Sequence, residues 1–270
     1  MLADLPRRAH AGLRPRLIPM RTGRPLKRWR YVGVYAPELM VCAGLVRVAG
    51  VPQSFWAVWD RATGILHERT QPGHGRIELS DEGARVAAGD VHVALALEPA
   101  GEPVEVLSPH GAAPIWTRKL PVRARGTVTL GPRRVALAAT GLIDESAGWH
   151  ARETAWSWSA GVGTSVAGEP VAWNLVDGVH DAPRASERTV WVAGHEREAG
   201  PARFAGDLGR VTAGDVDLRF AAEAERARRD RAGPFASDYR QPFGTFSGTL
   251  GDGVELAEGW GVMESHDVKW

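Results

Sequence analysis

Short runs of alternating or β-branched residues follow one another along the chain from residue 29 onward, separated by Gly, Pro and Asp. These runs are WRYVGVY, SFWAVWD, VHVALAL, GTVTL, WSWSAGVG, PVAWNLV, RTVWV, VDLRF, GTFSGTL and VELAEGWGVM. Such strands and turns are typical of an all-β sandwich or barrel. Residues 221–231 instead contain good helix formers and an i,i+4 pair of Glu225 and Arg229. They predict one short, solvated surface helix.

The chain also resembles itself. Residues 135–146 and 254–265 share V-x-L-A and a closing Glu-Ser pair at an offset of 119, and the tripeptide HER occurs at 67–69 and 195–197. Ordered matches of this kind indicate two diverged β units in tandem. We therefore expect a basic extended leader over residues 1–24, a first β unit over 25–143 and a second over 144–270.

Composition and charge exclude several classes of protein. The 270 residues are 44% hydrophobic and 24% charged, which excludes a disordered or collagen-like chain. The net charge is +1, yet residues 1–30 hold eight Arg and one Lys against Asp4 alone. No aromatic stacking pattern or helix-turn-helix signal follows this segment, which argues against nucleic-acid binding. We expect a Pro-interrupted leader lying over an acidic body.

Several further features concern compartment and cofactors. Cys42 lies in the apolar run LMVCAGLV and is expected to be a buried thiol. The longest apolar stretch, residues 39–51, is interrupted by Arg47 and is too short to span a membrane as a helix. Prolines and arginines occupy the place of a signal peptide's apolar region, so we expect a cytoplasmic protein. No spacing typical of a metal site, a phosphate loop or a nucleophile elbow occurs, so we expect neither a metal nor a cofactor. The sequence does not indicate an oligomeric state.

Two carboxylates share a strand face with apolar residues. In LAEGWGVME, alternation places Glu258 and Glu264 with Trp260 and Val262. If this face is interior, Glu258 is desolvated and its pKa rises, as a general acid near neutral pH requires. Alternatively, Glu258 pairs with Arg152 or Arg240, or the face points to solvent.

Other candidates lie near the joint between the halves and in two loops. The chain has 11 Trp, more than its 6 Phe and 3 Tyr together, and large indoles either fill a β core or line a ligand pocket. His150 is a candidate acid or base near neutrality, or else a structural residue. The candidate catalytic residues are Glu258, His150, Asp144 and Glu145. The candidate ligand-binding residues are Trp149, Trp156, Trp158, Trp173, Asn174, His180, Tyr239, Arg240, Gln241, Phe243, Trp260 and Glu264.

Residues 20–270 resemble a bacterial family of unknown function. The resemblance rests on GRPLKRWRYVGVYAPELMVCAG, GWHARETAWSWSAGVG, AWNLVDGVHD, SERTVWV and DYRQPFGTFSGTLGDGVELAEGWGVMESHDVKW. That family is distantly similar to the hydroxyneurosporene synthase (carotenoid 1,2-hydratase) and tocopherol cyclase group. The resemblance implies two tandem lipocalin-like antiparallel β-barrel or sandwich units and a hydrophobic, isoprenoid- or lipid-like small molecule as partner.

The same resemblance implies alkene protonation by a carboxylic acid. Glu258, or else Asp144 or Glu145, would donate the proton, and His150 or Tyr239 would orient water. The indoles that would stabilise a cation are Trp156, Trp158, Trp173 and Trp260. The first repeat has Ala139 where the second has Glu258, so a symmetric carboxylate pair is not available. A non-catalytic carrier and a structural β module with a plugged interior remain alternatives.

Overall fold

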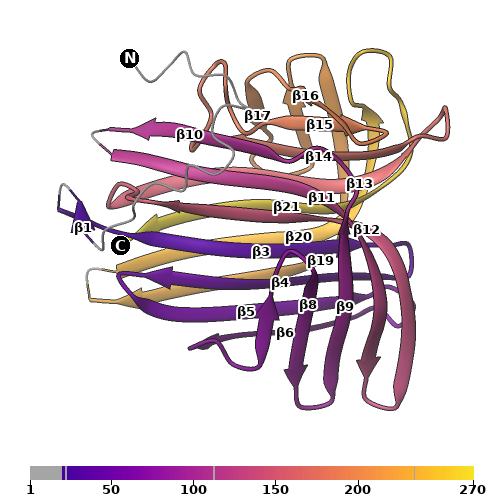
Figure 1. Cartoon of the computed structure of the whole chain (residues 1–270), viewed down its shortest axis with the longest axis horizontal. Helices are drawn as coiled ribbons and strands as arrows, with labels where there is room; N and C mark the ends of the chain where they lie inside the picture. The colour runs from indigo at the N-terminus through magenta and orange to yellow at the C-terminus, as the bar shows by residue number, and fades with distance from the viewer. Residues whose placement is uncertain (1–19, 22, 112, 234) are drawn as a thin grey trace.

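The computed structural model describes residues 20–21, 23–111, 113–233 and 235–270, and these form two large antiparallel sheets (Figure 1). A separate two-stranded ribbon joins β1 (Met20–Arg21) and β2 (Arg24–Pro25). The predicted all-β fold of two lipocalin-like units is confirmed. Residues 1–19 and 22 of the predicted leader lie outside the described residues. Among the described residues, no helix could cross a membrane.

The first sheet has the strand order β6-β5-β4-β3-β12-β11-β9-β8-β7, and β10 pairs with the other part of the long strand β11. Its strands are β3 (Lys27–Tyr35), β4 (Leu39–Val48), β5 (Val51–Asp60), β6 (Ile65–Pro72), β7 (Ile77–Leu79), β8 (Gly83–Ala88), β9 (Val91–Pro99), β10 (Val104–His110), β11 (Ala113–Leu130) and β12 (Arg133–Gly148).

The second sheet has the order β16-β15-β14-β13-β21-β20-β19-β18-β17. Its strands are β13 (Glu153–Ser165), β14 (Pro170–Asp177), β15 (Thr189–Val192), β16 (His195–Glu198), β17 (Ala202–Phe204), β18 (Arg210–Ala213), β19 (Val216–Ala232), β20 (Phe235–Thr249) and β21 (Leu256–Lys269). Apart from β10, the two sheets therefore follow the same path. The change of sheet comes after Gly148, so the predicted boundary at 143/144 lies within β12.

A second sequence match accompanies this shared order. The segment R-V-x-A-G-D-V occurs at 85–91 and at 210–216, and it forms the β8–β9 hairpin in one sheet and the β18–β19 hairpin in the other. In each turn the glycine, Gly89 or Gly214, has a φ near +65° (63° and 66°), a conformation that glycine adopts without steric cost. The same local sequence thus makes the same turn at the same place in both sheets.

Each sheet curls around its own apolar core. In the first, the edge strand β7 lies near β3 and β4, and Figure 1 shows β8 and β9 running crosswise to β3, β4 and β5. Val34, Val58 and Val122 belong to the inner core of this sheet. Val190, Leu218 and Met263 belong to the corresponding core of the second sheet. The opposite, outer faces of the two sheets pack on each other and form a third core.

The predicted helix at residues 221–231 is wrong, because these residues lie inside β19. They pair with β20 from Asp217 to Ala232, so ladder hydrogen bonds override their helix propensity. A β-bulge between Ala222 and Ala224 inserts Glu223 into the strand. The extra residue reverses the faces of the following side chains, which brings Arg226 to the outer face of the second sheet.

Candidate functional site

The layer between the two outer faces holds most of the buried charge described below. Its apolar members come from β3, β4, β5, β10, β11 and β12 of the first sheet and β13, β14, β15, β20 and β21 of the second. Burying charged groups in such a layer is unfavourable unless each is paired or neutralised. The layer therefore concentrates the ionisable groups that could carry chemistry.

Glu264 lies in this layer among three hydrogen-bond donors from two strands, β13 and β20. Its Oε1 accepts from Trp156 Nε1 at 2.8 Å, and its Oε2 accepts from Tyr239 Oη at 3.1 Å and from Gln241 Nε2 at 3.0 Å. Burial raises the pKa of Glu264 to about 7, although the bonds from Trp156 and Tyr239 act to lower it. The nearby Asp144 also raises it. Glu264 can therefore hold or release a proton near neutral pH.

The buried Arg226 fixes the donors around Glu264. Its Nη1 lies 3.3 Å from Tyr239 Oη and 3.3 Å from Gln241 Oε1, and its Nε donates to Glu68 at 2.9 Å. Because Gln241 Oε1 accepts from Arg226, its Nε2 is turned toward Glu264. The Cys42 Sγ also lies 3.7 Å from Gln241 Oε1. Cys42 is buried and free, as predicted.

A second buried group contains one cation and two carboxylates. Lys119 Nζ lies 2.5 Å from Asp144 Oδ1 and 3.2 Å from Glu187 Oε1. Burial raises the pKa of Asp144 to about 6, against the effect of Lys119, and Glu187 raises it further. Two carboxylates thus share one ammonium, which favours retention of a proton within the group.

Histidines occupy another part of the layer. The ring centroid of His150 lies 5.0 Å from that of Trp29, 5.9 Å from His110 and 6.3 Å from His180. Burial keeps the pKa of His150 well below its usual value, and His180, Lys27 and His110 act in the same direction, so His150 is neutral. Lys27, whose Nζ donates to the backbone oxygens of His150 and Ala151, has a pKa lowered by burial to about 7. Within the described ranges, no three side chains are placed to hold a metal ion.

Aromatic rings connect these groups. Trp156 stacks on Trp29 with centroids 6.3 Å apart, and it lies 4.5 Å from the His266 ring. His266 in turn lies 5.1 Å from the Tyr239 ring. Burial lowers the pKa of His266 to about 4, so this imidazole is also neutral. Trp156 and Tyr239, which both donate to Glu264, thus lie against neutral aromatic rings.

One pocket lies where the two sheets meet at the end of β5. It has a volume of about 490 Å³ and is lined by Pro37, Glu38, Trp59, Arg61, Ala62 and Glu223. Trp59 also belongs to the core between the sheets. Arg61 Nε and Trp59 Nε1 both donate to Glu223 Oε2, at 2.7 and 3.0 Å. The bulge residue Glu223 of β19 therefore lines a pocket at the edge of the layer.

The structure brings many of the predicted site residues to the layer between the sheets. These residues are Asp144, His150, Trp156, Trp158, Asn174, His180, Tyr239, Gln241, Phe243, Trp260 and Glu264. Trp149 is buried in the connection between β12 and β13. Of the two carboxylates that alternation placed on one face of β21, Glu264 is buried in the layer and Glu258 is exposed.

Four predicted residues lie elsewhere. Glu258 is exposed, with Oε1 3.5 Å from Thr164 Oγ1, so the predicted desolvation of this carboxylate is wrong. It lies near the exposed start of β21, whereas Glu264 lies near the strand's middle. Arg240 is exposed and pairs with Glu225. Trp173 packs against Phe246 in the inner core of the second sheet, and Glu145 lies on the inner face of the first.

Several residues of the layer are not among those predicted from the sequence. Arg226 was hidden by the helix prediction. Lys119 was overlooked because it lies in RKLP, yet alternation from Ile115 through Thr117 would have placed it on the same face. Trp29 and His266 lie far apart in the sequence, and no pattern joins them before the sheets are paired. The register of β13 with β21 places Trp156 beside His266, and the packing of the two sheets stacks Trp29 on Trp156.

Comparisons with known proteins identify a family and a fold. A family model described as a domain of unknown function (DUF2804) matches residues 76–270. No curated protein matches the chain. Among solved structures, the chain is similar to an AttH-type protein of Nitrosomonas europaea, with a TM-score of 0.61, 15% identity and coverage of 90% of this chain and 92% of that one. It is also similar to kievitone hydratase of Nectria haematococca, with a TM-score of 0.55, 9% identity and 88% coverage of each chain.

Proposed function

Because the chain belongs to the DUF2804 family of unknown function, we propose its function from its own geometry: it is an enzyme that protonates a carbon–carbon double bond of a hydrophobic small molecule. Hydration, cyclisation and isomerisation all begin with this step. The observation that carries the proposal is Glu264, a buried carboxyl group with a pKa of about 7 among aromatic side chains. A carboxylic acid at neutral pH in an apolar site is the form that general acid catalysis requires.

The proposed step transfers the proton of Glu264 to one alkene carbon. The electron pair of the double bond forms the new C–H bond and leaves a cation on the other carbon. The faces of Trp156 and Trp158 stabilise that cation through their ring quadrupoles. In hydration, a water molecule held by Tyr239 adds to the cation, and its released proton returns to the Glu264 carboxylate. The acid is then restored for the next turnover.

The surroundings of Glu264 support this role. Arg226 raises the local positive potential, and it also holds Tyr239 and Gln241 against Oε2 of Glu264. The pKa of Arg226 lies above its usual value, because Tyr239, Cys42 and Glu68 outweigh the opposing effect of burial. Arg226 therefore stays charged throughout the reaction. The opening at Trp59 and Glu223 is the proposed route for the substrate.

The fold likeness to a hydratase agrees with this proposal but does not determine the reaction, since one fold serves many functions. The test starts with native mass spectrometry of protein purified from its own host, followed by solvent extraction of any retained molecule. That molecule, and farnesol as a model isoprenoid alkene, are then incubated with the protein in D₂O. We expect a product that carries deuterium on carbon.

The variant Glu264→Gln should bind the alkene without producing this product, whereas Glu258→Gln should behave like the wild type. Glu258 is the matched control because it is an exposed carboxylate on the same strand. Turnover retained by Glu264→Gln would remove Glu264 from the mechanism. Binding without any conversion by the wild type would identify a carrier, and a protein that neither retains nor binds an apolar molecule would be a structural module.

A further inference from the structure

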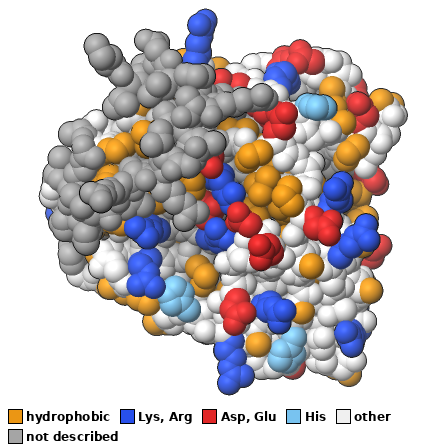
Figure 2. Space-filling model, in the orientation of Figure 1, with side chains coloured by type: hydrophobic (Ala, Val, Ile, Leu, Met, Phe, Trp, Pro, Cys, Tyr) orange, Lys and Arg blue, Asp and Glu red, His pale blue; other side chains and the backbone are white. Residues whose placement is uncertain are grey.

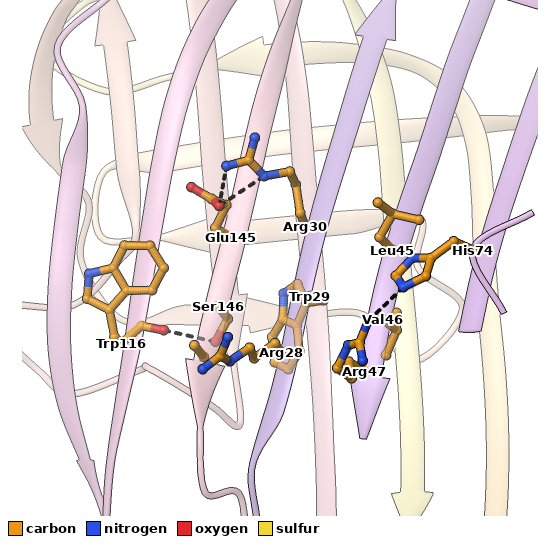
Figure 3. A pocket seen from close by; sticks show the side chains of 11 residues that line it. Arg28, Trp29, Arg30, Leu45, Val46, Arg47, His74, Trp116, Glu145 and Ser146 are labelled. Atoms are coloured by element: carbon orange, nitrogen blue, oxygen red, sulfur yellow. Dashed lines mark hydrogen bonds and ion pairs between the residues drawn. The ribbon is translucent and has the colours of Figure 1, made fainter. Parts of the chain in front are cut away.

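We propose that the inner face of the first sheet carries a second ligand site, which binds a small organic anion with an apolar body. A pocket of about 350 Å³ lies there, on the side of the sheet opposite to Asp144 and Lys119. Four adjacent strands, β4, β3, β12 and β11, supply its floor, and the loop after β6 supplies His74 at its side (Figure 3). This volume is near the lower end of the range for ligand sites.

Part of the charge around the pocket is neutralised internally. Arg30 Nη2 lies 2.6 Å from Glu145 Oε1, and Arg118 Nε lies 2.8 Å from Glu145 Oε2. Both arginines also contact Asp81, at 3.2 and 2.5 Å. Two guanidinium groups and two carboxylates thus form a closed quartet. The quartet fixes Arg30 at the pocket wall and leaves no net charge there.

Two further arginines at the pocket are not neutralised in this way. Arg47 donates to the backbone oxygen of Gly50 at 3.2 Å, and its Nη2 lies 2.8 Å from His74 Nε2 (Figure 3); neither partner is a carboxylate. Arg28 has no carboxylate partner among the residues that the structure describes. On the face shown in Figure 2, by contrast, Lys and Arg side chains lie interspersed with Asp and Glu. The pocket therefore carries an excess of positive charge.

Apolar side chains of the same face complete the lining. Leu45, Trp116 and Ala147 contribute to it. A guanidinium pair beside an apolar surface matches a carboxylate-bearing molecule, because guanidinium groups bind carboxylates in a bidentate manner. A simple inorganic anion would leave the apolar surface uncovered. A neutral apolar molecule would leave Arg28 and Arg47 without a counter-charge.

Isothermal titration calorimetry with octanoate, octan-1-ol and octylammonium tests this inference on the full chain. We expect saturable binding of octanoate, and binding of the alcohol and the cation weaker by about tenfold or more, because each lacks the charge-assisted hydrogen bonds. Equal binding of octanoate and octan-1-ol would overturn the proposal, because the arginines would then contribute nothing.

The variant Arg28→Ala/Arg47→Ala should weaken octanoate binding by about tenfold or more. The matched control Arg85→Ala/Arg134→Ala removes two exposed arginines of the same sheet that do not line the pocket, and it should bind octanoate like the wild type. Arg28→Lys/Arg47→Lys should retain binding partly, which distinguishes lost charge from misfolding.

Octanoate affinity that persists in Arg28→Ala/Arg47→Ala, or that falls equally in the control, would refute the site. Glu264→Gln should leave octanoate binding unchanged, since Glu264 lies between the sheets. The anion site and the proposed acid can therefore fail or succeed separately.

Discussion

The raised pKa of Glu264 makes a measurable contribution to the pH dependence of folding. In the unfolded chain this carboxyl has an ordinary pKa near 4.5, and in the folded protein burial raises it to about 7. Below pH 4.5 both states are protonated, and the stabilising contribution is fully present. As pH rises toward 7, the unfolded chain releases its proton while the folded protein retains it. The free energy of unfolding therefore falls across this window.

The size of the effect follows from the shift. One pKa unit corresponds to about 1.4 kcal/mol, so the change from 4.5 to about 7 amounts to roughly 3 kcal/mol between about pH 4.5 and about pH 8. Glutamine at position 264 has nearly the same shape and cannot titrate. Glu264→Gln should lose some stability at every pH, because its amide turns one donor toward Trp156, Tyr239 or Gln241.

The measurement is urea unfolding at several pH values for the wild type, Glu264→Gln and the exposed control Glu258→Gln. The stability of Glu264→Gln relative to the wild type should increase by roughly 3 kcal/mol from about pH 4.5 to about pH 8. The relative stability of Glu258→Gln should stay nearly constant. A relative stability of Glu264→Gln that does not change with pH would show that folding does not raise the pKa of Glu264, and would remove the basis of the proposed acid.

Three further changes test the packing of the layer and of the sheets. Lys119→Met leaves Asp144 and Glu187 without their shared cation. Urea unfolding should show a free energy of unfolding lower by about 3–5 kcal/mol. A loss under about 1 kcal/mol would contradict the pairing. Gly261→Ala would bring a Cβ within 2.2 Å of the Ala160 carbonyl oxygen, so it should lower the free energy of unfolding by about 1–3 kcal/mol or more. The control Gly206→Ala has open space around it and should change the free energy of unfolding by under about 1 kcal/mol. Burial raises the pKa of Cys42, so a thiol reagent such as 5,5′-dithiobis(2-nitrobenzoic acid) should label it only after urea unfolding; rapid labelling of native protein would contradict its burial.

Alternation along the strands was enough to predict the fold class and to group the residues that share one face of β21. It could not show where along β21 the buried layer ends, so alternation alone did not distinguish Glu258 from Glu264. The pairing of β21 with β13 and β20 decides between them, because only Glu264 meets Trp156, Tyr239 and Gln241. For residues 221–231 the local helix propensity was strong and predicted a helix, but pairing with β20 makes them part of a strand. The match of 85–91 with 210–216 was readable from the sequence and locates the same hairpin in both sheets.

The ends of β12 and β21 match in sequence, yet a difference of one residue in register decides which of their side chains face the layer between the sheets. Sequence alignment equates Glu145 with Glu264, yet Glu145 lies on the inner face of its sheet with Arg30, and Glu264 lies between the sheets. Deleting one residue of β21 just before Met263 would exchange the faces of Met263 and Glu264. The carboxyl would enter an apolar core, and a thioether would meet Tyr239. Among relatives of this chain, insertions and deletions within strands would therefore change chemistry more than most substitutions, and a conserved alignment column need not mean a conserved site.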